Sequence, residues 1–185
     1  MKKFTRNAGV SMMEMLITLL ILGMVAAIGL PSLNGFIEDN RLNAAIADLQ
    51  SSMQTARAEA VGRNAYVTMC KRNTAGTDCV TSGGWQQGWL LFVDVNGDGT
   101  VDGGDEILYV HDALLGTLTL HGTTNVEDLI VFRPSGQTSV SSMQTFILCD
   151  ERGFVEGAKG LMVSIMGRGS TMSATSTAQT DCLVP

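Results

Sequence analysis

The chain opens with a long apolar stretch that carries a single charge. Residues 10–33 hold one ionisable side chain, Glu14, in 24 positions. At about 1.5 Å of rise per residue, a helix of this length crosses a hydrocarbon core of roughly 30 Å. The pattern therefore predicts a helical segment that is apolar on every side and lies in an apolar environment such as a bilayer.

A different apolar pattern follows, in which apolar residues recur at intervals of three and four. This stripe consists of Leu42, Ala45, Ile46, Leu49, Met53, Ala56 and Ala60. Together the two segments predict one long helix over about residues 11–63. We expect Gly29 and Pro31 to loosen it and Gly62 to end it. Its second half should pack its stripe on a globular domain.

Beyond residue 65 the pattern changes to short runs of Val, Ile, Leu, Phe and Thr, separated by Gly, Asp, Asn and Ser. The runs are 66–71, 88–95, 107–111, 117–121, 129–133, 145–149 and 161–165. No helical pattern lies between them, so we expect antiparallel strands. The Ser/Thr-rich residues 169–180 suit either a tail tethered by Cys182 or an edge strand. The predicted fold class is α+β: a long amino-terminal helix packed on a β-rich antiparallel head.

The charge of the chain limits its partners. Its 185 residues include 12 basic and 18 acidic side chains, so the length suits one domain plus an anchor. Three basic residues, Lys2, Lys3 and Arg6, precede the apolar segment, which predicts a cytoplasmic leader and an extracytoplasmic head. Without them nine basic residues face eighteen acidic ones, the wrong sign for an electrostatic DNA trap.

Glu14 requires its own explanation. A carboxylate at the centre of a membrane helix costs about 2.5–3.5 kcal/mol, so we expect it to have a partner. A secretory signal would place a small-residue cleavage site after the apolar core, but Ala26-Ala27-Ile28 is a poor one. A cut before the apolar segment, after Gly9, would instead retain it and make Val10 the first residue.

These features together resemble a known processing signal. Lys2, Lys3, Arg6, Gly9, Val10 and Glu14, followed by about twenty apolar residues, resemble the class III signal of type IV prepilins and type II secretion pseudopilins. The resemblance implies that a prepilin peptidase cleaves after Gly9 and methylates the amino group of Val10. Glu14 would then pair with the terminal amine of a neighbouring subunit.

The same resemblance implies three segments. Residues 1–9 form the leader, residues 10–33 the transmembrane and assembly half of the helix, and residues 34–185 the extracytoplasmic pilin head, which includes the amphipathic half. The chain would span the inner membrane once before it enters a pilus or pseudopilus.

The β region extends the resemblance. The blocks WQQGWLLFVDVNGDG, VFRPSGQ, ILCDERG and LMVSIMGRG are similar, in this order, to blocks of the GspH/FimT branch of minor pilins and pseudopilins. This implies a non-enzymatic minor pilin that assembles with other pilins and helps to initiate a type IV pilus. The alternatives are a minor pseudopilin of a type II secretion system and a DNA-binding pilin for DNA uptake.

DNA binding depends on one block. Some FimT-like pilins are linked to DNA through a carboxyl-terminal G-R-x-R block, which reads Gly167-Arg168-Gly169-Ser170 here. Arg168 is therefore the candidate DNA contact. Because the second arginine is absent and the head is acidic, DNA is not the favoured partner.

Four cysteines lie in the predicted extracytoplasmic part, where disulfides form. Of the three pairings we favour Cys70–Cys79 and Cys149–Cys182, because each ties a loop-like segment to a strand-like one. A zinc site would need tighter clusters such as C-x-x-C.

One acidic segment has the spacing of a calcium-binding loop. Oxygen-bearing residues occupy positions 1, 3, 5, 7, 9 and 12, with glycine at position 6: they are Asp94, Asn96, Asp98, Thr100, Asp102 and Asp105. The alternative is a hairpin connection in which Asp, Asn and Gly supply turns and side-chain caps. We expect no required cofactor, and calcium is the one candidate ion.

Enzymatic activity is not expected. The two histidines, His111 and His121, are isolated, and Trp85 and Trp89 suit packing at a hairpin. The sequence contains no nucleophile turn of the G-x-S-x-G type and no nucleotide-binding loop.

Overall fold

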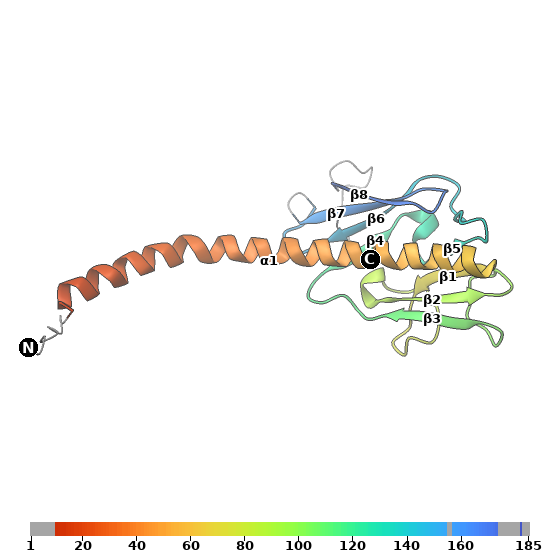
Figure 1. Ribbon diagram of the computed structural model, residues 1–185, viewed down its shortest axis with the longest axis horizontal. Coiled ribbons are helices and arrows are strands. Elements are labelled where there is room, and N and C mark those ends of the chain that lie inside the picture. Colours follow the sequence, from red (N-terminus) through yellow and green to blue (C-terminus); the bar gives the residue numbers. More distant parts are fainter. Residues whose placement is uncertain (1–9, 155–156, 174–181, 183–185) are drawn as a thin grey trace, which may run out of the picture. The chain divides into compact units, whose positions relative to one another are not determined.

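The computed structural model describes residues 10–154, 157–173 and 182. Contacts divide the chain into two compact units, Met1–Glu38 and Asp39–Pro185. One helix, α1, runs from Met12 to Arg63 and contributes to both units (Figure 1). All described strands belong to the second unit, here called the head. The predicted α+β fold, with a long amino-terminal helix and an antiparallel β head, is confirmed.

The end of α1 differs slightly from the prediction. The backbone is helical at both Gly29 and Pro31, and it is still helical at Gly62. The turn out of the helix occurs at Asn64, whose φ is 52°, and the N–H of Ala65 donates to the carbonyl of Ala60 at 3.2 Å. Asn tolerates this left-handed conformation better than most residues, so Asn64 takes the role expected of Gly62.

The first sheet contains four antiparallel strands in the order β3-β2-β1-β5. They are β1 (Tyr66–Lys71), β2 (Trp89–Asp94), β3 (Glu106–His111) and β5 (Leu129–Phe132). The two central strands, β1 and β2, are buried almost throughout, which explains their continuous rather than alternating apolar runs. A short 3-10 helix, Trp85–Gln87, leads into β2.

The second sheet has the order β4-β6-β7-β8, again antiparallel. Its strands are β4 (Thr119–Gly122), β6 (Gln144–Cys149), β7 (Ala158–Val163) and β8 (Gly169–Ser173). A second 3-10 helix, Thr124–Val126, follows β4. The Ser/Thr-rich segment therefore begins with an edge strand, β8, while residues 174–181 lie outside the described part of the chain.

One predicted strand is displaced. The run 161–165 was expected to be extended, but β7 ends at Val163 and residues 164–168 form a turn. The N–H of Gly167, whose φ is 70°, donates to the carbonyl of Ser164 at 2.9 Å. This conformation favours glycine, so Gly167 ends the strand earlier than side-chain composition suggests.

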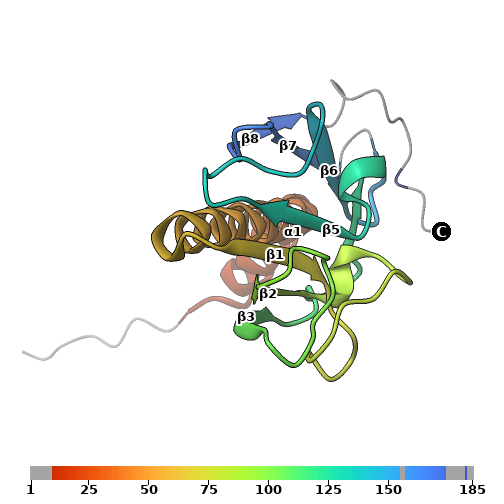
Figure 2. The same ribbon diagram turned by 90° about the vertical axis from the view of Figure 1, so that its right-hand side faces the viewer.

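The core lies where the second half of α1 meets both sheets (Figure 2). Every residue of the predicted stripe is at most 5% exposed, and the prediction is confirmed. The stripe packs in one cluster with side chains of the first sheet, such as Met69 and Phe132, and of the second, such as Phe146 and Leu161. Residues 39–63 of α1 are therefore an integral part of the head.

Candidate functional site

The predicted assembly residues lie at the amino end of α1. Val10 is 67% exposed and precedes the helix. Glu14 lies in the first turn, where the carbonyl of Ser11 accepts the N–H groups of Glu14 and Met15 at 3.0 and 3.1 Å. Among the described residues, the Glu14 carboxylate makes no hydrogen bond and no ion pair. Gly9 and the rest of the leader lie outside the described residues, so cleavage there stays a prediction.

The first half of α1 exposes apolar side chains on all sides. Every residue from 11 to 27 is exposed, including Met12 at 82% and Leu22 at 68%. An apolar surface of this extent marks a site of contact with other molecules. Over the residues with a described placement, no helix combines the length and the apolar character needed to cross a membrane.

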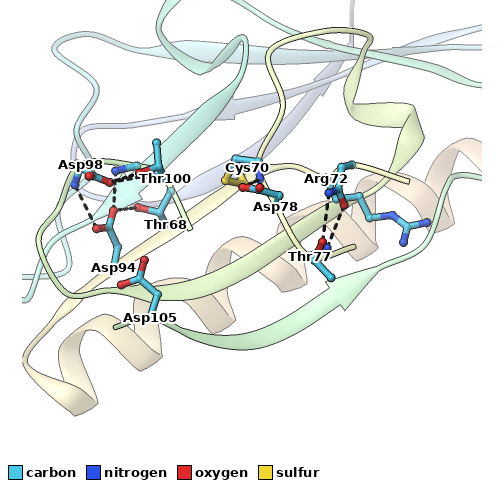
Figure 3. The surroundings of a disulfide bond; sticks show 12 residues. Thr68, Cys70, Arg72, Thr77, Asp78, Asp94, Asp98, Thr100 and Asp105 are labelled. Atoms are coloured by element: carbon cyan, nitrogen blue, oxygen red, sulfur yellow. Dashed lines mark hydrogen bonds between the residues drawn. A yellow bond between two sulfur atoms is a disulfide. The ribbon is translucent and has the colours of Figure 1, made fainter. Parts of the chain in front are cut away.

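Both favoured disulfides are present. Cys70 in β1 is joined to Cys79, which fastens the loop after β1 to the first sheet (Figure 3). Cys149 at the end of β6 is joined to Cys182, which holds this residue beside the second sheet. The first bond therefore closes the loop after β1, and the second links the described residue Cys182 to β6.

The acidic loop, residues 94–105, is organised around Asp94, which is fully buried. One carboxylate oxygen accepts the N–H groups of Gly97 and Asp98 at 2.6 and 3.1 Å. The other accepts the N–H of Gly99 at 2.9 Å and the hydroxyl of Thr68 at 2.7 Å (Figure 3). Asp94 therefore caps the loop and anchors it to β1, the neighbouring strand.

The remaining polar side chains of the loop bind one another. The Asn96 amide donates to Asp98 and Asp102, each at 3.0 Å. The hydroxyl and N–H of Thr100 donate to Asp98, at 2.7 and 2.8 Å, and these bonds lower the pKa of the Asp98 carboxyl. Asp105 accepts two backbone N–H groups.

In this arrangement the polar side chains of the loop bind one another and do not form a metal-binding site. Among the described residues no three His, Cys, Asp or Glu side chains are arranged to hold a metal ion. The geometry is that of a hairpin connection closed by side-chain caps. Calcium binding by this loop stays a prediction.

The two tryptophans are fully buried in the head, and the two histidines are half-buried. Trp85 donates its indole N–H to the carbonyls of residues 126 and 127 and contacts Phe146 edge-on at 5.1 Å. Trp89 is stacked on His111 with ring centroids 3.9 Å apart. Burial, with a smaller contribution from Lys71, lowers the pKa of His121. The packing role predicted for the tryptophans is confirmed.

Arg168, the candidate DNA contact, lies in the β7–β8 turn beside a groove of about 710 Å³. The opposite wall is α1, which contributes Arg57. Arg57 is half-buried, and its Nε donates to the carbonyl of Gly136 at 3.0 Å. No sequence pattern predicts that Arg57 and Arg168 line the same groove, because only the register of the β7–β8 hairpin brings Arg168 opposite this part of the helix.

An ion-pair network between α1 and the loop after β6 was also not predicted from the sequence. Asp150 is buried after β6 and accepts the Nε and an NH2 group of Arg152 at 2.9 and 2.6 Å. The same guanidinium reaches Asp39 on α1 at 2.8 Å. These two carboxylates raise the pKa of Arg152. The network ties the first helical turn of the head to the loop after β6.

Comparisons with known proteins fit this architecture. The family described as “Type II transport protein GspH” matches residues 45–169. The pilin-like protein PilA1 of Thermus thermophilus is 35% identical over 105 residues, which are 56% of this chain and 58% of that protein. The chain thus spans a little over half the length of this relative.

Solved structures agree with the fold. Two crystal forms of the type IV minor pilin FimU from Pseudomonas aeruginosa superpose with TM-scores of 0.59 and 0.55, at 26% and 25% identity. They cover 80% and 77% of this chain and 99% and 100% of their own chains. The head and its packed helix are therefore pilin-like.

The family match spans most of the buried helical stripe and both sheets as far as the start of β8. It also includes the acidic loop and the groove that Arg57 and Arg168 line. By this match, the chain belongs to the GspH family of type II transport proteins.

Proposed function

We propose that this chain is a minor pilin, a non-enzymatic structural subunit that assembles with other pilins and helps to initiate a type IV pilus. The observation that carries the proposal is the exposed apolar surface of residues 11–27, in a chain whose head buries its own core. Family membership supports it, as does likeness to FimU, which is named a type IV minor pilin.

The proposal includes processing and location. A prepilin peptidase would cleave after Gly9 and methylate Val10, and residues 10–33 would anchor the chain in the inner membrane until assembly. The two disulfides of the head support an extracytoplasmic location, since such bonds form in oxidising compartments. The mass of the mature amino-terminal peptide tests this: we expect N-methylated Val10, and an intact leader would contradict it.

The test of assembly concerns Glu14. Its carboxylate has no partner in the described chain, and we propose that it pairs with the terminal amine of a neighbour. Glu14→Ala and the isosteric Glu14→Gln should leave membrane insertion intact and lower recovery in sheared filaments at least ten-fold. Ser11→Ala, at the residue just before α1, is the matched control. Recovery of both Glu14 variants at wild-type levels would refute the pairing.

A minor pseudopilin of a type II secretion system is the second candidate, and the description of the matching family favours it. Deleting the gene separates the two. Loss of surface pili with normal secretion supports the pilin, whereas loss of secreted proteins with normal pili supports the pseudopilin.

A further inference from the structure

Strand β3 forms one edge of the first sheet, and none of its six residues is buried (Figure 1). Its apolar side chains Ile107, Tyr109 and Val110 are 38%, 47% and 37% exposed. Proteins protect such edges with proline, lysine or a covering segment. β3 contains neither proline nor lysine, and its one register shift lies before Tyr109. Residues 109–111 are therefore a regular edge that is suited to pair with another strand.

The other three sheet edges are covered in part by neighbouring segments. The N–H of Ser139 donates to a carbonyl of β5 at 2.8 Å. The side chain of Gln86 accepts an N–H of β4 at 3.1 Å, and that of Gln50 donates to a carbonyl of β8 at 3.3 Å. Among the described residues, the main chain of β3 has hydrogen-bond partners only in β2. Over this part of the chain, β3 is therefore the open edge of the head.

The alternation of an antiparallel ladder shows which groups of β3 point outward. The N–H of Arg72 donates to the carbonyl of Gly88 at 3.2 Å, so the even-numbered residues of β2 face β1. The odd-numbered residues of β2 therefore face β3, where their register partners include Tyr109 and His111. Val110 lies between these two and directs its N–H and its carbonyl away from the sheet.

A groove follows the open edge, between β3 and α1. Two hollows of about 200 and 210 Å³ adjoin there, because Asp48 of α1 and His111 of β3 line both. The first contains Tyr109, and the second is lined mainly by alanine and leucine as far as Leu115. Side chains of a strand alternate between its faces. A strand added beside β3 would therefore direct every second side chain into these hollows.

The groove also favours one charge. The Asp48 side chain is 57% exposed, and its one ion-pair partner among the described residues is His111, 3.7 Å away. β3 itself contributes no lysine or arginine. A cationic side chain that enters the groove would therefore meet a carboxylate without a close partner.

We propose that β3 accepts an extended segment of a different pilin as a fifth strand of the first sheet. Another strand is the partner that offers a donor and an acceptor at the spacing of the free main-chain groups. The segment would carry apolar side chains toward the hollows and one lysine or arginine toward Asp48. The inference rests on the proposed function, which supplies pilins of other kinds as neighbours.

A second copy of this chain is the competing occupant. Two β3 edges that pair antiparallel make a two-fold contact, in which the heads point in opposite directions. The proposed filament instead holds its subunits in parallel. A second β3 would also bring no lysine or arginine to Asp48. The geometry and the charge of the groove therefore favour a different chain.

Photo-crosslinking in cells that produce the full-length chain and its filament tests the contact. The probe is benzoylphenylalanine in place of Thr55, an exposed residue of α1 that lines the first hollow. We expect a bond to a different pilin, within one segment that mass spectrometry identifies. Val110→Pro removes the outward N–H and should lower the yield at least ten-fold, because proline cannot donate to a ladder. Val110→Ala keeps the N–H and is the matched control, with a loss below two-fold.

A second variant leaves β3 intact and keeps the test valid if Val110→Pro does not fold. Asp48→Lys should lower the yield at least five-fold, because it sets a cation against the cation expected on the partner. Glu151→Lys, which reverses an exposed carboxylate after β6, should leave the yield unchanged. Thermal unfolding of each full-length variant in detergent shows whether its head is folded.

Three outcomes would overturn the inference: a bond only to a second copy, equal yields in folded Val110→Pro and Val110→Ala, or a yield that Asp48→Lys does not lower. If sheared pili contain the chain but no bond to another pilin forms, only this inference fails. If the chain is absent from pili and the bond, sensitive to Val110→Pro, joins it to a pseudopilin, pairing at β3 stands and the proposed function fails.

Discussion

The two halves of α1 are both rich in apolar residues, but only the second is buried by its own chain. Residues 11–27 are exposed on every side, whereas Leu42 and Leu49 in the second half are 1% and 0% exposed. The pattern explains the difference: a one-sided stripe matches one packing surface, whereas residues that are apolar all round need neighbours on all sides. The first half therefore depends on other molecules and the second on the head.

The most direct test of this contrast is to remove the same side chain from each half. Leu49→Ala deletes a fully buried side chain and should cost about 2–5 kcal/mol of unfolding free energy. For a chain of this size that is roughly 4–20 °C in melting temperature. Thermal unfolding of the full chain in detergent can be followed by tryptophan fluorescence, because Trp85 and Trp89 both lie in the core.

Leu20→Ala is the matched control, since Leu20 is 58% exposed and lies in the first half. It should leave this melting temperature unchanged within about 1 °C, as is usual for exposed substitutions. An equal loss in both variants would mean that the first half also belongs to the folded core.

The next test asks where along α1 the contacts with the rest of the head begin to contribute to stability. Arg152→Gln removes the charged partner of buried Asp150 and the contact with Asp39. Leaving a buried carboxylate without its partner should cost about 1–3 kcal/mol, read from the same melt. Asp39→Asn, which changes only the exposed end of the network, should cost clearly less. If Arg152→Gln leaves the melting temperature unchanged, this helical turn is stabilised by other contacts.

Periodicity and composition predicted much of the head. The stripe from Leu42 to Ala60 could be predicted because a helix that is buried on one face has apolar residues at helical intervals along its sequence. The strands were predicted from short runs of residues typical of strands. Their bounds differ where a turn residue such as Gly167 ends an element, and also at the starts of β4 and β7, which begin at Thr119 and Ala158 instead of residues 117 and 161.

Long-range placement could not be predicted in the same way. Three features depend on which strands pair and in which register: the division of the strands into two sheets, the groove that Arg57 and Arg168 both line, and the network of Arg152 with Asp39. A single sequence contains no direct record of that pairing. The elements were therefore predicted well, and the surfaces that they build together were not.

A test with a smaller expected effect asks whether the loop of the head needs a calcium ion in addition to its own hydrogen bonds. If loop 94–105 binds calcium as its spacing predicts, a tenfold excess over the Kd should stabilise the chain by about 1.4 kcal/mol. The measurement is the melting temperature with calcium and with chelator. Asp98→Asn/Asp102→Asn should lose the response, because it removes two of the carboxylates that the spacing predicts as ligands. Equal midpoints for the wild type would leave the loop as a connection held by Asp94 and its hydrogen bonds.

The smallest expected effect is a pH dependence from His121, which is half-buried and whose Nε2 has no hydrogen-bond partner among the described residues. Burial and then Lys71 lower its pKa from the usual 6.5, so the folded chain favours the neutral ring. The unfolded chain takes up a proton first as the pH falls below about 6.5, and this part of the stability is lost toward the lower folded pKa. Melting temperatures between pH 7.5 and 5.5 should therefore fall less steeply in His121→Gln than in the wild type. If the melting temperatures of both proteins fall with the same slope, the neutral state of the His121 imidazole contributes nothing to stability. The surroundings of His121 would then tolerate a charged ring.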